Sequence, residues 1–243
     1  MFRYPEFDVE IVRKISPQGL RWPERGEAAN GRNLSCNRSY TDLRGLTWKD
    51  VQRVLELETA LVRRIEDAAD PDAEHRQIED ELFEEDEGLF GLDIGVAGAT
   101  VALAAARCIT CSSCNAGSYG GHHHEAYPVV AFFGRPYHVK LLLACAERAQ
   151  IGLECPNGIV VALAKDIRDM GQFAAILLAC RGEFRAAERA SKARLQSTTS
   201  VGPPSGLAAM GGALEFTFSG RVHRRRGSAA QTARRRGQPA KRP

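Results

Sequence analysis

The amino-acid sequence predicts an α+β fold, in which helices pack on a small mixed or antiparallel sheet. The apolar run YPVVAFF at 127–133 is typical of a strand that is buried on both faces. A segment with helical spacing follows at 136–149, and Pro156-Asn157-Gly158 then separates two short strand-like runs, as in a hairpin. A further helix begins at Asp166. The order of these elements predicts a β-α-β-β-α core.

Helices are also expected before this core. Thr47 and Asp50 have the spacing of a capping box, in which each side chain satisfies a free amide of the first helical turn. Apolar residues then recur at helical spacing until Asp70-Pro71 breaks the helix. A second, strongly acidic helix is predicted at 72–86. The small apolar residues of 94–107 predict a helix that is buried.

Four local features complete the expected fold. Residues 9–15 have the pattern of a short strand, and residues 108–114 are compatible with a further strand or with a loop. Pro136 suits the first turn of a helix, and Gly152 has the position of a residue that ends that helix.

Charge divides the chain into parts of different character. Residues 221–243 contain nine Lys or Arg and no acid, residues 66–87 contain twelve acids and one Arg, and the whole chain carries only +3. We predict an irregular N-terminal arm at 1–46, an α+β globular domain at 47–195, and a low-complexity linker with a disordered basic tail at 196–243. The acidic helix is interpreted as a solvated face, or as a surface for a basic partner.

The composition is that of an ordinary globular protein, with 44% hydrophobic and 26% charged residues. The N-terminus MFRYPEFDVE has no apolar core of a secretory signal, and no apolar stretch is long enough to span a bilayer. The seven cysteines are an odd number, which favours reduced thiols or metal ligands over a disulfide framework. We therefore expect a cytoplasmic protein without membrane contact.

Three cysteines, Cys108, Cys111 and Cys114, form the pattern C-x2-C-x2-C. With His122 they could complete a tetrahedral zinc site, because the glycine-rich loop between them can fold back. An iron–sulfur cluster is a weaker alternative, with Cys155, which precedes a proline, as its fourth ligand. Strict strand alternation would point Cys111 away from the other two, so that the three would not converge. Buried structural cysteines are the competing interpretation.

A thiol enzyme is a third interpretation of the same segment. Cys114 would be the nucleophile, His123 or His124 its base, and Glu125 or Asn115 the group that orients the histidine. The histidine triplet also fits a solvated polar loop, and His138, on the first turn of a helix, is expected to be structural.

These observations lead to three functional hypotheses. The first is an accessory or interaction protein with an unknown protein partner, and the lack of a complete catalytic motif favours this non-catalytic role. The second is a zinc-binding protein or Cys/His thiol enzyme centred on residues 108–125. In the third, the basic tail binds nucleic acid without sequence preference and in a salt-dependent manner. The glycines at 91, 95 and 98 do not have the spacing of a phosphate-binding loop.

Overall fold

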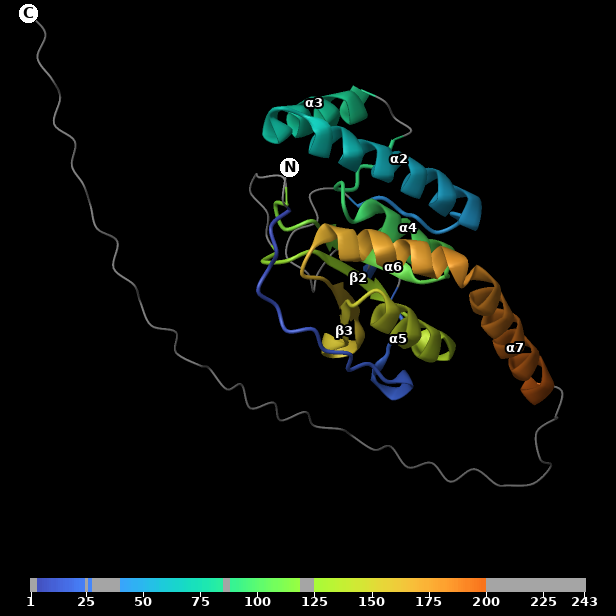
Figure 1. Ribbon diagram of the computed structural model, residues 1–243. Coiled ribbons are helices and arrows are strands. Elements are labelled where there is room, and N and C mark those ends of the chain that lie inside the picture. The colour runs from blue at the N-terminus through green and yellow to red at the C-terminus, as the bar shows by residue number, and fades with distance from the viewer. Residues whose placement is uncertain (1–3, 25, 28–39, 85–87, 119–124, 200–243) are drawn as a thin grey trace, which may run out of the picture. The chain divides into compact units, whose positions relative to one another are not determined.

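A four-stranded antiparallel sheet organises the fold, with strand order β1-β2-β4-β3 (Figure 1). The structure is a computed structural model, and it describes residues 4–24, 26–27, 40–84, 88–118 and 125–199. The strands are β1 (Ile109–Cys114), β2 (Val129–Phe133), β3 (Gly152–Glu154) and β4 (Val160–Leu163).

Three helices pack against one face of this sheet, and two more lie outside them (Figure 1). The inner helices are α4 (Ala97–Ala105), α5 (Val139–Arg148) and α6 (Ile167–Ala179). Helix α2 (Trp48–Asp67) packs on α4 and α6, and α3 (Pro71–Glu84) packs on α2. Helix α7 (Arg181–Thr199) follows α6 after one residue, and short 3-10 turns lie at Pro17–Gly19, Pro136–His138 and Pro156–Gly158. The α+β class and the β-α-β-β-α core are therefore confirmed as β2, α5, β3, β4 and α6.

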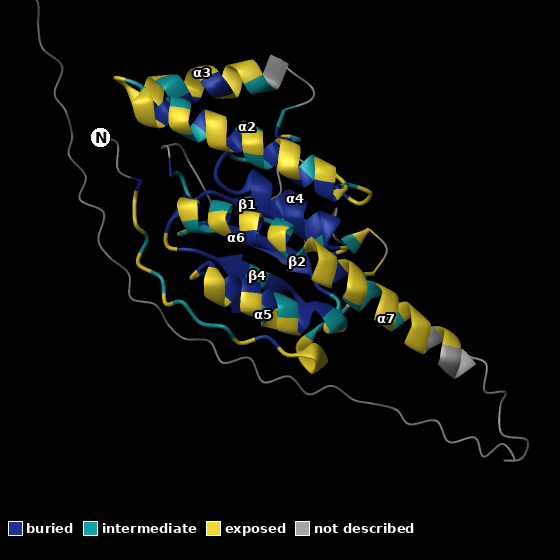
Figure 2. Ribbon diagram, turned by 45° about the vertical axis from the view of Figure 1, so that its right-hand side comes forward, coloured by how far each residue is buried: buried dark blue, intermediate teal, exposed yellow. Residues whose placement is uncertain are grey.

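Local sequence signals account for most helix boundaries. The Thr47 amide donates to the Asp50 carboxylate at 2.7 Å, and the Lys49 amide donates to the Thr47 hydroxyl at 3.3 Å, so the predicted capping box is formed. Pro71 begins α3, where its missing N–H costs nothing. All nine residues of α4 are buried, and their small side chains let this helix lie between α2, α6 and the sheet (Figure 2).

Strand β2 is buried on both faces, as its apolar run predicts. Val130 and Phe132 belong to the main core beneath the helices. Their neighbours Ala131 and Phe133 contribute to a second, smaller cluster on the opposite face, against which Tyr40 packs. The segment before α2 therefore covers part of the face that the helices leave open.

The N-terminal segment runs beside β3 without forming the predicted strand at 9–15. A single parallel bridge joins Arg13 to Leu153, because the Leu153 amide donates to Val12 O at 2.8 Å and the Lys14 amide to Leu153 O at 2.7 Å. Gly152 permits this approach, since a Cβ there would lie 3.0 Å from Val12 O and 2.6 Å from the side chain of Leu163.

The prediction that Gly152 ends a helix is therefore wrong. Helix α5 ends at Arg148, and Gln150 takes the left-handed conformation that follows it, with φ of 57°. The close packing of two chain segments, rather than a turn, requires the glycine at 152.

The C-terminal part of the described chain is helical to Thr199, somewhat beyond the predicted domain boundary at 195. The predicted disordered tail lies outside the described residues, and the three-part division of the chain stays a prediction. No helix in the described part of the chain is both long and apolar enough to cross a membrane.

Candidate functional site

The three predicted cysteine ligands lie on both faces of the sheet. Residues 109–114 form a strand, but its register against β2 shifts between Thr110 and Ser112, so that Cys111 occupies a β-bulge. Cys111 therefore packs with Ala131 on the face opposite the helices, whereas Cys108 belongs to the main core on the helix side.

The expectation from strict alternation is thus wrong about which cysteine differs. Cys114 packs beside Val129, on the same face as Cys111, and Cys108 is the one that points to the other face. The bulge supplies the extra residue that changes the alternation. Cys108 therefore lies across the sheet from Cys111 and Cys114.

The chemistry of two of these thiols is set by burial. Burial raises the pKa of Cys108 and of Cys111 to about 12, and the Cys111 thiol donates to Ala131 O at 3.3 Å. At neutral pH such a group is a thiol rather than the thiolate that binds metal or attacks a substrate. Both therefore act as small core residues in this state.

Cys114 stands at the end of β1, where Asn115 anchors the following turn. The Asn115 side chain donates to Ile94 O at 3.0 Å and accepts from the Gly117 amide at 3.0 Å. The backbone amide of Asn115 donates to the Asp93 carboxylate at 3.3 Å. Asn115 therefore holds two loops together, and its predicted role in orienting a histidine stays a prediction.

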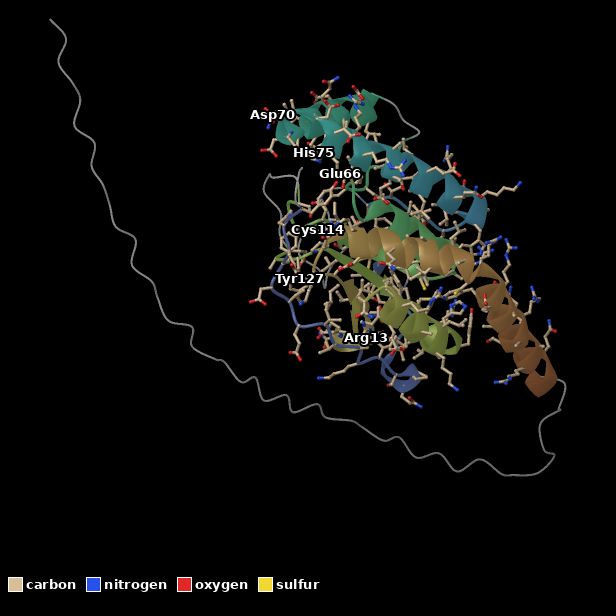
Figure 3. The ribbon with its side chains drawn as sticks, viewed as in Figure 1. Arg13, Glu66, Asp70, His75, Cys114 and Tyr127 are labelled. Carbon is tan, nitrogen blue, oxygen red and sulfur yellow. The ribbon has the colours of Figure 1, made fainter. Side chains whose placement is uncertain are left out.

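The remaining residues of the predicted sites cannot be placed against Cys114. His122, His123 and His124 lie outside the described residues, and Glu125 is the first residue described after them, with intermediate exposure. Tyr127 packs in the same cluster as Cys114 (Figure 3). Across 4–24, 26–27, 40–84, 88–118 and 125–199, no three His, Cys, Asp or Glu side chains are grouped to hold a metal ion. The zinc, iron–sulfur and thiol-enzyme sites stay predictions.

The glycine-rich loop before α4 does contain an anion cradle, and the protein fills it itself. The Glu58 carboxylate of α2 accepts from the amides of Gly95, Ala97 and Gly98 at 2.8–3.0 Å. Burial raises the pKa of this carboxyl, and the three hydrogen bonds oppose the rise. Glu58 thus caps the positive end of α4 from another helix.

Sequence reasoning missed Glu58, although a signal exists. Val54, Glu58, Leu61 and Ile65 follow one another at helical spacing on the buried face of α2. A carboxylate on such an apolar stripe indicates a buried partner, because a lone buried charge is too costly to keep.

His138, like Arg13, has buried side-chain nitrogens without a hydrogen-bond partner in the described structure. It lies in the 3-10 turn before α5 and is only 1% exposed. Within the described structure neither Nδ1 nor Nε2 has a hydrogen-bond partner, and the rings of Tyr137 and Phe184 meet the imidazole edge to face, with centroids at 4.3 and 5.0 Å.

Burial lowers the pKa of His138 to about 4. The backbone of Phe184 raises the pKa of the imidazole and so opposes the effect of burial, but it is not in hydrogen-bond geometry with either ring nitrogen. At neutral pH the imidazole is therefore uncharged, and it offers one N–H donor and one acceptor nitrogen.

His138 lines a cavity of about 110 Å³ between four elements that are distant in sequence. The cavity is bounded by the start of α2, the end of α4, the 3-10 turn and the first turns of α7. Its lining consists of Leu46, Thr47, Trp48, Ala105, Ala106, Arg107, His138, Phe184, Arg185 and Glu188. Aromatic and aliphatic groups form most of this wall, and charged groups come from the end of α4 and from α7.

The charges at this cavity are predominantly positive. Arg107 and Arg185 contribute two cations, and Glu188 contributes one carboxylate. Lys192 holds Glu188 at 2.7 Å, and together with the more distant Arg107, at 3.9 Å, it lowers the pKa of that carboxyl. The positive end of α2 and the negative end of α4 both border the cavity, so its net positive charge comes from the side chains.

A second, more open hollow of about 570 Å³ lies over residues 88–94, with Thr41, Glu79 and Leu82 on its border. Its most polar loop residue, Asp93, accepts from the Asn115 amide. This hollow therefore adjoins the turn after Cys114, and Asp93 already takes part in holding that turn.

Comparisons with known proteins provide no relative for this site. No protein family, no curated protein and no solved structure matches the chain.

Proposed function

We propose that this chain is a non-catalytic accessory protein that acts by binding, and that the cavity at His138 is its ligand site. The observation that carries the proposal is the imidazole of His138, which is buried in the cavity wall with no hydrogen-bond partner in the described structure.

A buried imidazole of this kind lowers the stability of the fold unless a ligand supplies a hydrogen-bond partner. A buried polar group without a partner costs about 1–3 kcal/mol, and native proteins keep few of them. Residues that break a rule of folding are concentrated at functional sites. A ligand with an acceptor or donor facing His138 would remove this cost.

The cavity selects a small, planar and anionic ligand. A volume of about 110 Å³ holds about three water molecules and is somewhat smaller than the apolar cavity of about 150 Å³ that binds benzene, so that a single ring is the largest group it would take. Phe184 and Trp48 provide aromatic walls, and Arg185 and Arg107 provide donors for a carboxylate. We therefore propose a small aromatic or heteroaromatic carboxylate.

The lining favours binding over catalysis. Among the described lining residues Thr47 has the one hydroxyl, and this hydroxyl donates to Asp50 and accepts from the Lys49 amide, so it belongs to the helix cap. With a pKa of about 4, His138 is a weak base at neutral pH.

Trp48 fluorescence can test this proposal directly. The chain has two tryptophans, so Trp22→Phe leaves Trp48 as the only reporter. Titration with benzoate and nicotinate should give a saturable change, and cyclohexanecarboxylate, which is not planar, should bind more weakly. Arg185→Gln should weaken binding roughly tenfold, as expected for one charged hydrogen bond. Arg189→Gln, on the same helix but outside the cavity lining, is the matched control.

The role of His138 has its own readout. Nicotinate has a ring nitrogen that can accept from the imidazole, so we expect it to bind more tightly than benzoate, and His138→Phe should abolish that preference. If neither carboxylate gives a saturable signal, or if Arg185→Gln and Arg189→Gln have equal effects, the proposed ligand site is wrong.

A basic protein partner is a second proposal, which the acidic end of the α2–α3 pair supports. Glu66, Asp67, Asp70 and Asp72 are exposed there, and Figure 3 labels Glu66 and Asp70 at this corner. Arg64 pairs with Glu74 and Glu81 and so leaves this corner acidic. Reversal of three of these charges to Lys should abolish salt-sensitive binding to polylysine, and unchanged binding would exclude this surface.

Nucleic-acid binding and a cytoplasmic location stay predictions from the sequence. The first requires that affinity for a duplex oligonucleotide falls steeply with salt and is lost on deletion of residues 221–243.

A further inference from the structure

Two cysteines outside every site considered above lie together at the junction of α5, α6 and α7. Cys145 is a buried residue of α5, and Cys180 is the single residue between α6 and α7. Helix α5 packs against α6, and Cys180 packs against the core to which Cys145 belongs. Arg148, one turn after Cys145 on the same helix, donates from Nη1 to the Cys180 sulfur at 3.4 Å. The guanidinium of Arg148 therefore joins the turn of α5 that carries Cys145 to the sulfur of Cys180.

We propose that Cys145 and Cys180 form a reversible disulfide when the protein meets a hydroperoxide. Neither thiol takes part in the proposed ligand site, so the bond can form whether or not that site binds a ligand.

The two sulfurs have different surroundings, and these assign their roles. Cys180 is partly exposed and has a guanidinium N–H beside its sulfur, which suits a sulfur that must carry negative charge when it attacks. Cys145 is 1% exposed, and burial together with the neighbouring Cys180 raises its pKa to about 12. Cys180 is therefore the attacking thiol and Cys145 the resolving thiol.

The chemistry balances with hydrogen peroxide as the oxidant. The Cys180 sulfur, having given its proton to solvent, attacks one peroxide oxygen. The O–O bond breaks, and the released hydroxide takes up a proton to become water. The product is Cys180 sulfenic acid. Cys145 then loses its proton as its sulfur attacks the Cys180 sulfur, the S–O bond breaks, and the hydroxyl group leaves as water. Two thiols and one peroxide thus give one disulfide and two waters.

The bond would fasten the junction on which α7 depends. The amide of Phe184 donates to Cys180 O at 3.2 Å, and that of Glu183 donates to the same oxygen at 3.1 Å, so the Cys180 carbonyl accepts the first hydrogen bonds of α7. Phe184 in turn lines the His138 cavity. An effect of the disulfide on ligand affinity therefore follows only if the proposed function is right, whereas formation of the bond does not depend on it.

Peptide mapping of the full-length protein tests the bond itself. Trypsin releases Cys145 in peptide 141–148 and Cys180 in peptide 169–181, each with a single cysteine. After peroxide treatment and alkylation of the remaining thiols, we expect the two peptides to be joined, and to separate on reduction with dithiothreitol. The closed form should melt about 10 °C higher, because a cross-link between distant residues restricts the unfolded chain.

Three variants separate the roles of the residues. Cys145→Ser should leave a sulfenic acid at Cys180 that dimedone traps, and Cys180→Ser should abolish both products. Arg148→Gln should slow closure several-fold without changing the product, as expected of a positioning residue. Cys155→Ser is the matched control, because Cys155 is also partly exposed but lies on the hairpin, and it should have no effect. A disulfide between any other pair, or oxidation of Cys180 no faster than that of Cys155, would overturn the proposal.

Discussion

The Glu58 carboxylate accepts a hydrogen bond from the Gly98 amide at 3.0 Å, across forty residues of sequence. A Cβ on residue 98 would lie 2.6 Å from this carboxylate oxygen, so the glycine permits the contact. The same carboxylate also binds the amides of Gly95 and Ala97, and it thereby fastens α2 to the start of the buried helix α4. This contact is central to the stability of the fold.

Glu58→Ala should lower the free energy of unfolding by about 3–5 kcal/mol, because it leaves three buried amides without an acceptor. Glu56→Ala, at an exposed position of the same helix, should change it by no more than about 0.5 kcal/mol. Urea denaturation measures both values. Formate should restore part of the lost stability of Glu58→Ala, since the emptied helix end binds anions. Equal effects of the two variants would contradict this account of Glu58.

His138 should make stability depend on pH. Its pKa is about 4 in the folded protein and 6.5 in the unfolded chain. Between these values the unfolded chain binds a proton that the folded protein does not, so stability falls as the pH is lowered from 6.5 to 4. The loss is about 3 kcal/mol in total.

His138→Phe removes this term, and with it an unsatisfied buried polar group. We expect the variant to be more stable than the parent at pH 7 by about 1 kcal/mol, and by a larger amount at pH 4.5. Thermal unfolding across this pH range measures the difference in stability between the two proteins. The carboxylates that both proteins share titrate equally, so their contribution cancels in this difference. Parallel pH profiles would show that His138 does not titrate as described.

Gly152 should tolerate no side chain. In Gly152→Ala the new Cβ meets the side chain of Leu163 and Val12 O, so β3 and the N-terminal segment must move apart. We expect a loss of about 1–3 kcal/mol. Gly171→Ala is the matched control, because nothing lies within 4 Å of its Cβ and it is inside α6, where the substitution should stabilise by about 0.5–1 kcal/mol. A Gly152→Ala protein as stable as the parent would contradict the close approach.

Cys108 and Cys111 should resist alkylation in the folded protein. A pKa of about 12 leaves roughly one thiolate in 10⁵ at pH 7, which is about a thousandfold less than in an unfolded peptide. Mass spectrometry of iodoacetamide-treated protein reads each site separately, and the denatured protein serves as the control. Rapid labelling of either cysteine would contradict its raised pKa and would favour a role as a nucleophile or a metal ligand.

Features carried by a few neighbouring residues could be predicted from the sequence. The capping box at Thr47 and the hairpin at Asn157 depend on local backbone chemistry, which neighbouring residues determine. The apolar run of β2 likewise indicates burial on both faces, because adjacent side chains of a strand point to opposite faces and all five are apolar.

Features made by residues far apart in sequence emerged only from the folded chain. Pairing with β2 produces the bulge that places Cys111 on the same face of the sheet as Cys114. No residue type at 110–112 predicts this bulge. The environment of His138 is built from four distant elements, so an unremarkable helix-start histidine becomes a buried group without a partner. The spacing of apolar residues predicts which positions face the core. The packing of the elements then determines which groups each buried side chain contacts.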